Sequence, residues 1–160
     1  MKVWKGAWIV VLTCFMFLTA CTPQPGLEED LNAAVKKVQD SDGGATGNGL
    51  LRMSYVASNF EWDKLYIFSS KMTKEVVNNS LGFQWEGAKD DVVGGINDRQ
   101  CLFVFVKDDK VVRTVKHDRG KGDFVPITKP LTPNTAVFLA DKTEKGHWIF
   151  KPASWGNSRN

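Results

Sequence analysis

The chain has 160 residues with 21 Lys and Arg against 18 Asp and Glu, a formal net charge of +3. This length suits one domain with its own core. Without Lys2 and Lys5 at the N-terminus the formal charge falls from +3 to +1. Such a small excess gives no indication of nucleic acid or of an acidic surface as a partner.

The N-terminal segment has the pattern of an export signal. Lys2 and Lys5 precede an apolar run over residues 7–17. As a helix this run would span only about 16 Å, well short of the ~30 Å hydrocarbon core of a bilayer. The pattern therefore predicts a signal peptide over residues 1–20 rather than a permanent transmembrane helix.

Four residues at the end of this segment, Leu18-Thr19-Ala20-Cys21, resemble the lipobox of bacterial lipoproteins. The resemblance implies that residues 1–20 are removed, that Cys21 carries a diacylglycerol, and that the new amino terminus is often acylated, for example by palmitate. Several acyl chains give stable membrane anchoring. Thr22, where Asp would signal retention, resembles the sorting pattern for the outer membrane in enteric-type bacteria. We therefore expect a lipoprotein facing the periplasm, or the outer face of the cell membrane in a Gram-positive organism.

The first part of the mature chain predicts a tether and a helix. Residues 21–26 form a lipidated tether, in which the five residues after Cys21 reach at most ~17 Å. Apolar residues at helical spacing then predict a helix over residues 27–40, with acidic residues in its first turn. A Gly-rich loop follows over residues 41–49. Either the helix before it is loosely attached to the domain or the loop is a mobile surface element, and a linker is favoured over a binding loop.

The main domain is predicted over residues 50–154. Residues 50–59 are ambiguous between a helical turn and a strand, and residues 65–68 form a strand. A short helix over 73–81 is expected to be capped by Ser69 or Ser70 and stopped by Gly82, with Phe83 and Trp85 packed beneath it. Further segments are a loop over 89–99, a hairpin of strands 101–106 and 111–116, strands over 136–140 and 148–150, and a loose tail over 155–160.

These elements predict an α+β fold. We expect a single domain with a mainly antiparallel β-sheet of about five strands, one short packed helix and an N-terminal helix. The strand over 101–106 is apolar on both faces and should be central. Because Cys14 leaves with the signal and Cys21 is lipidated, only Cys101 remains, and no intrachain disulfide is possible.

A basic cluster is the first candidate binding site. It contains Arg113, Lys116, His117, Arg119 and Lys121, with Lys129 nearby. Such a cluster suits lipid phosphates, anionic glycans or an acidic partner, although a solvated charged loop is the simpler interpretation. Trp155, in the tail, is the aromatic residue that we expect to be exposed at a binding face.

A catalytic interpretation of the same region rests on His117, Asp118 and His147, with Cys101 as a possible nucleophile. A His/Asp pair can orient a general base. We favour solvated histidines at strand ends and a buried core thiol, because no nucleophile elbow and no metal-ligand spacing accompany these residues. The acidic pairs in the chain are typical of turns rather than of a calcium loop. We expect neither a metal nor a cofactor.

The segment from Trp62 through Phe68, followed by the helix ending at Leu81 and by the hairpin that begins at Leu102, resembles a pattern in small bacterial envelope proteins. The resemblance covers roughly residues 60–125 and brings no catalytic motif with it. In those sequences a proline or tyrosine usually follows the first strand, whereas Ser69-Ser70-Lys71 follows it here.

The leading functional hypothesis is a non-enzymatic, membrane-anchored lipoprotein that binds another macromolecule in the envelope. Two forms are an immunity protein against an envelope-targeting toxin and an accessory subunit of an envelope or secretion complex. The alternatives are a small envelope hydrolase that uses His117, Asp118 and His147, and a ligand-binding lipoprotein with an apolar pocket beside Trp62 and Trp85.

Overall fold

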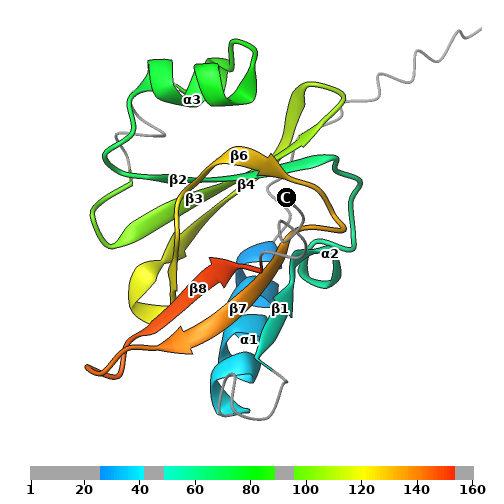
Figure 1. Cartoon of the computed structure of the whole chain (residues 1–160). Helices are drawn as coiled ribbons and strands as arrows, with labels where there is room; N and C mark the ends of the chain where they lie inside the picture. Colours follow the sequence, from blue (N-terminus) through cyan, green and yellow to red (C-terminus); the bar gives the residue numbers. More distant parts are fainter. Residues whose placement is uncertain (1–25, 42–48, 89–95, 154–160) are drawn as a thin grey trace, which may run out of the picture.

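The computed structural model describes residues 26–41, 49–88 and 96–153. The predicted signal peptide, Cys21, most of the Gly-rich loop and Trp155 lie outside these ranges. The described residues form an α+β domain with two four-stranded sheets, which confirms the predicted fold class (Figure 1).

The first sheet contains the predicted hairpin. Its strand order is β4 (Lys110–Asp118), β3 (Gln100–Lys107), β2 (Lys64–Ser69) and β6 (Ile127–Leu131), all antiparallel. The turn between β3 and β4 consists of Asp108 and Asp109, whose φ angles are 48° and 55°. Two residues with positive φ are the geometry that matches the twist of a hairpin.

Strand β3 is central, as its sequence predicts. Cys101, Phe103 and Phe105 point into one hydrophobic cluster, whereas Leu102, Val104 and Val106 point into a second cluster on the opposite face. The alternation of side chains along a strand explains why a run without polar residues needs cover on both sides.

The second sheet raises the strand number above the predicted five. Its order is β1 (Leu50–Arg52), β7 (Val137–Lys142), β8 (Trp148–Pro152) and β5 (Asp123–Phe124), with β5 parallel to β8. Strands β5 and β6 are missing from the prediction, and β1 lies in the segment that the prediction left ambiguous. Strands β1 and β5 are very short, and β6 contains Lys129 and Pro130, which suit only an edge strand.

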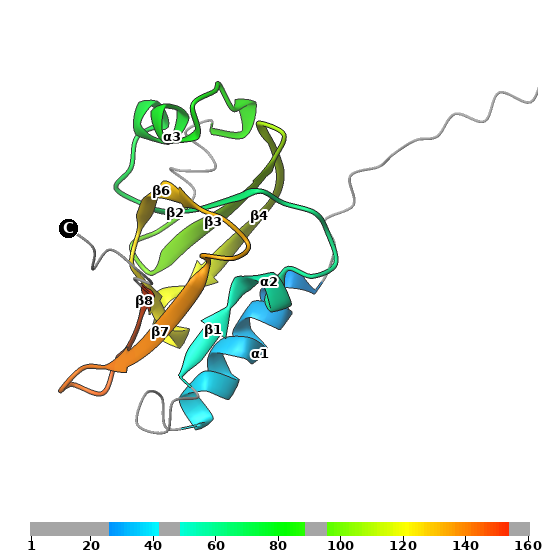
Figure 2. The ribbon, with the colours of Figure 1, turned by 45° about the vertical axis from the view of Figure 1, so that its right-hand side comes forward.

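Helix α1 (Leu27–Asp40) confirms the predicted helix and is packed against the domain rather than loosely attached to it. Its buried residues Leu27, Leu31, Val35 and Val38 belong to the same cluster as Phe103 and Phe105. Figure 2 shows α1 beside β1 and the short helix α2 (Met53–Val56). The ambiguous segment 50–59 therefore contains a strand and a helical turn in succession.

Helix α3 (Lys74–Leu81) covers the second cluster on the far face of the first sheet (Figure 1). Thr73 caps it by accepting a hydrogen bond from the Val76 amide, so the predicted cap at Ser69 or Ser70 was wrong. Strand β2 continues through Ser69, which leaves the start of the helix to Thr73. Gly82, at φ 81°, ends the helix as predicted. Short 3₁₀ turns η1 (Glu86–Ala88) and η2 (Arg119–Lys121) complete the described elements.

Candidate functional site

The main candidate site is a cavity of about 630 Å³ at one end of the domain. This volume lies within the range of ligand pockets in proteins. Three separate parts of the chain line it: the end of α1, the η2 turn with β5, and the turn from β7 into β8. Its lining residues are Gln39, Arg119, Gly120, Gly122, Asp123 and residues 143–149. We call it the η2 cavity.

The η2 turn is held by its own hydrogen bonds. The Asp118 carboxylate accepts a hydrogen bond of 2.8 Å from the Gly120 amide, and the Gly122 amide donates to the Arg119 carbonyl over 3.2 Å. Gln39 at the end of α1 donates to the carbonyl of Lys121. The turn that forms one wall of the η2 cavity is therefore fixed to both β4 and α1.

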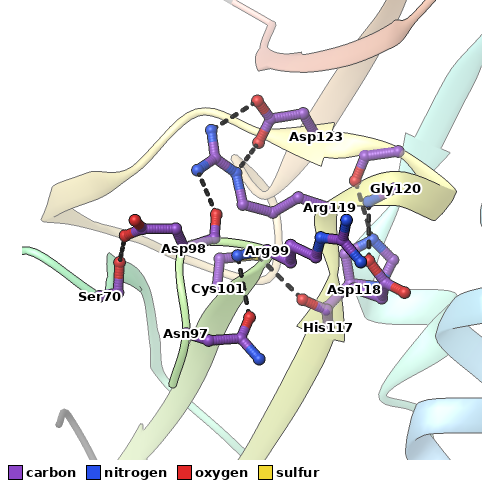
Figure 3. A network of polar contacts seen from close by, with 11 residues as sticks. Ser70, Asn97, Asp98, Arg99, Cys101, His117, Asp118, Arg119, Gly120 and Asp123 are labelled. Carbon is purple, nitrogen blue, oxygen red and sulfur yellow. Dashed lines mark hydrogen bonds and ion pairs between the residues drawn. The ribbon is translucent and has the colours of Figure 1, made fainter. Parts of the chain in front are cut away.

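Arg119 is the centre of the polar network in Figure 3. Its Nε and Nη2 donate to the two carboxylate oxygens of Asp123 at 2.7 and 2.8 Å, and its Nη1 donates to the Asp98 carbonyl at 3.0 Å. The hydrogen bond to Asp123 raises the pKa of Arg119 further. Ser70 donates to the Asp98 carboxylate, which extends the network to the end of β2. The paired guanidinium is thus a fixed, neutralised wall of the η2 cavity rather than an open anion site.

The opposite wall is the turn between β7 and β8. The Thr143 hydroxyl accepts a hydrogen bond of 3.0 Å from the His147 amide, and Gly146 adopts a φ of 82°. Glu144, Lys145 and His147 are all exposed on this turn. This wall therefore presents charges of both signs and an imidazole to solvent.

His117 does not belong to this surface. It is fully buried, with 0 % of its surface exposed, between the rings of Phe103 and Phe124. Its Nε2 bonds the Gly122 carbonyl at 2.9 Å, and Nδ1 has no partner among the described residues. Burial lowers the pKa of His117, which keeps the ring neutral. The prediction of a solvated binding histidine was wrong because β4 turns this position inward, toward the core cluster.

The remaining members of the basic cluster are not brought together. Arg113 opposes Phe105 in the register and lies 5.7 Å from the Phe60 ring, on the side of the first cluster. Lys116 opposes Leu102, whose side chain lies in the cluster on the other face. Alternation along β4 therefore separates two residues that are close in sequence. Arg119 pairs with Asp123, and Lys121 is exposed on η2 beside the η2 cavity.

The residues of the hydrolase hypothesis do not form a linked group. Cys101 is 1 % exposed, and burial raises the pKa of its thiol to about 12, which confirms a buried core thiol. The Asp118 carboxylate bonds the Gly120 amide, and the His117 ring bonds the Gly122 carbonyl. Of the two histidines, His147 alone lines the η2 cavity. Across the described ranges, no three His, Cys, Asp or Glu side chains are grouped so as to hold a metal ion.

Trp62 and Trp85, beside which the ligand-binding alternative places an apolar pocket, do not lie together. Trp62 belongs to the first cluster and donates through its ring nitrogen to the Ala57 carbonyl over 3.2 Å. Trp85 packs against the second cluster, on the opposite face of the first sheet. A whole sheet therefore lies between the environments of the two rings. Trp155, the third predicted aromatic residue, lies outside the described residues.

Sequence reasoning missed most of the η2 cavity. Gln39 and the turn over 143–147 are far apart in sequence and carry no recognisable motif. Gly146, followed by His147, was the only local sequence signal of a tight turn at this place.

Comparison of the chain with protein-family models, curated proteins and solved structures found no match. In the ranges that the structure describes, no helix combines the length and apolarity needed to cross a bilayer.

Proposed function

We propose that the protein is a lipid-anchored, non-enzymatic lipoprotein of the bacterial envelope that binds another macromolecule through the η2 cavity. The anchor would be the acylated Cys21, and the expected location is the periplasmic face of the outer membrane. The observation that carries the proposal is a cavity of about 630 Å³ whose walls are fixed by hydrogen bonds and whose charged groups are of both signs.

The place of the η2 cavity relative to the tether supports this proposal. The tether joins the domain at Leu27, the first residue of α1, whereas Gln39 at the other end of the helix lines the η2 cavity. Twelve residues of α-helix separate the two points by about 18 Å. The η2 cavity therefore lies away from the point where the tether joins the domain, and a partner can reach it.

The chemistry of the cavity favours a protein partner. Asp123 neutralises Arg119, and Glu144 and Lys145 carry opposite charges on the facing wall. Nucleic acids require a clear excess of positive charge. A mixed set of donors, acceptors and opposite charges is instead typical of the polar part of a protein interface. No contact in the described structure favours the hydrolase alternative, because Cys101 and His117 are both buried.

The partner is tested by crosslinking in native membranes. A photoreactive benzoylphenylalanine replaces Lys145 on the wall of the η2 cavity or, as a matched control, the exposed Lys110 at the far hairpin. We expect one crosslinked protein from position 145 and none from position 110. Recovery of only the uncrosslinked protein from position 145 would contradict the proposal. The identity of the captured protein separates an immunity role, with a toxin as partner, from an accessory role in an envelope complex.

The anchor is tested separately with the substitution Cys21→Ser. We expect the unsubstituted protein to incorporate radiolabelled palmitate and to sediment with membranes. The variant should lose the label and keep the uncleaved N-terminus. A labelled variant would rule out Cys21 as the acylated residue, whatever the outcome of the crosslinking.

A further inference from the structure

A second hollow, of about 420 Å³, lies between α1, β1 and α2. These three elements lie side by side in Figure 2. The hollow is lined by Ala34, Lys37, Val38, Ser41, Leu50, Leu51, Arg52, Tyr55 and Val56. It shares no lining residue with the η2 cavity. We call it the α1–β1 groove.

The floor of the α1–β1 groove is apolar and continuous with the core. Val38, Leu51 and Val56 line it, and all three are buried members of the first hydrophobic cluster. Ala34 is partly buried and packs against the same cluster. A ligand that reaches this floor therefore contacts apolar side chains, and an apolar ligand is favoured because binding removes its surface from water.

The rim of the groove is cationic. Lys37 comes from α1 and Arg52 from the end of β1, and both side chains are exposed. Neither has an ion pair within the described part of the chain, whereas the adjacent Lys36 pairs with Asp40 at 2.7 Å. Two positive charges beside an apolar floor are complementary to an anion attached to an apolar body.

Tyr55 gives the groove an aromatic wall. It is 76 % exposed, the largest exposure among the large hydrophobic residues described. Tyr55 also lines a smaller adjoining hollow, which contains Asp30, Ser58 and Asn59. Asp30 is the one acidic residue in that adjoining hollow, so it would repel an anion there. The two ends of the surface therefore differ in charge, which orients an occupant.

We propose that the α1–β1 groove binds a single-chain anionic amphiphile, namely a long-chain aliphatic carboxylate. The alkyl chain would lie on Val38, Leu51 and Val56 against the Tyr55 ring. The carboxylate would lie between Lys37 and Arg52, where a guanidinium can donate two parallel hydrogen bonds. This site is independent of the η2 cavity and of any protein partner bound there.

The test uses the full-length protein, isolated from membranes in lipid nanodiscs. The probe is dodecanoate with a photoreactive diazirine on its chain, and the comparison probe is the dodecylamine with the same diazirine. After irradiation, labelled peptides are identified by mass spectrometry. We expect the carboxylate to label residues 34–41 and 50–56 and the amine to leave them unlabelled.

Matched variants test the role of the rim. In Lys37→Gln/Arg52→Gln the yield of labelled peptide should fall about tenfold, because a hydrogen bond to a charged group is lost. The control Lys74→Gln/Lys110→Gln removes two exposed cations elsewhere and should label like the unsubstituted protein. All four side chains are exposed, so circular dichroism should show an unchanged fold.

Three results would overturn the proposal. Equal labelling by the amine would show that the rim does not select an anion. Unchanged labelling of Lys37→Gln/Arg52→Gln would show that these two residues do not hold the carboxylate. Labelling centred on residues 143–149 would assign the probe to the η2 cavity instead.

Discussion

Gly122 lies where η2, α1 and β8 meet, and it supports the sharpest stability prediction. Its φ of 154° falls in a region that side chains rarely adopt. A Cβ atom at this position would lie 2.7 Å from Cε2 of Phe150 and 3.1 Å from Cγ1 of Val35. Both neighbours are buried in the first hydrophobic cluster, so neither can swing into solvent.

The substitution Gly122→Ala therefore combines two costs. A strained backbone conformation costs about 1–3 kcal/mol. Insertion of a methyl group into a packed core costs about 1–3 kcal/mol more. We expect the free energy of unfolding to fall by about 2–6 kcal/mol, a large part of the stability of a domain of this size.

Gly146→Ala provides the matched control. Gly146 also has a positive φ, of 82°, but a Cβ built there meets nothing within 4 Å. Only the left-handed penalty of about 1–2 kcal/mol then applies. Chemical denaturation followed by circular dichroism measures both variants as shifts of the midpoint at constant slope. Equal losses for the two variants would refute the reasoning, because the predicted difference comes mainly from contacts with Phe150 and Val35.

Three further predictions follow from local contacts. Because burial lowers the pKa of His117, the unfolded state binds a proton before the folded state does as the pH falls below about 6.5. The free energy of unfolding should then drop by up to about 1.4 kcal/mol per pH unit, and denaturation at several pH values should show a smaller slope for His117→Gln. Cys101 should resist a maleimide in the folded protein and react once urea unfolds it, because its buried thiol has a pKa near 12; rapid labelling in native buffer would contradict this. Thr73→Ala should lower the free energy of unfolding by about 1 kcal/mol through loss of the α3 cap. Thr128→Ala, at an exposed position on β6, is the control, and equal denaturation midpoints for the two variants would show that the cap contributes nothing.

The local elements were predictable where one short segment contains the whole signal. The hairpin of β3 and β4 follows from two β-rich runs around a polar turn, and α1 follows from apolar residues at helical spacing. Strands β5 and β6 could not be predicted, since they are short or polar and gain their hydrogen bonds only from distant partners. The split of the strands between two sheets depends on pairings between segments far apart in sequence, such as β1 with β7.

The candidate site was much less predictable. Nearness in sequence suggested that Arg113, Lys116 and His117 act together. Because side chains alternate along β4, Arg113 lies beside the Phe60 ring, Lys116 lies on the opposite face of the sheet, and His117 is buried in the core. The η2 cavity arises from Gln39, Arg119 and the turn over 143–147, which only the fold brings together. Proximity along a strand is thus a poor guide to a shared surface.

By itself, the sequence determined the α+β class, the hairpin and the buried thiol, because each depends on residue types within a short window, while the export signal and the lipobox stay predictions. The tertiary structure alone decided which charges meet, which histidine is buried and where the η2 cavity and the α1–β1 groove lie. Those features depend on which strands and helices pack against one another, and packing is set by the burial of apolar surface summed over the whole chain.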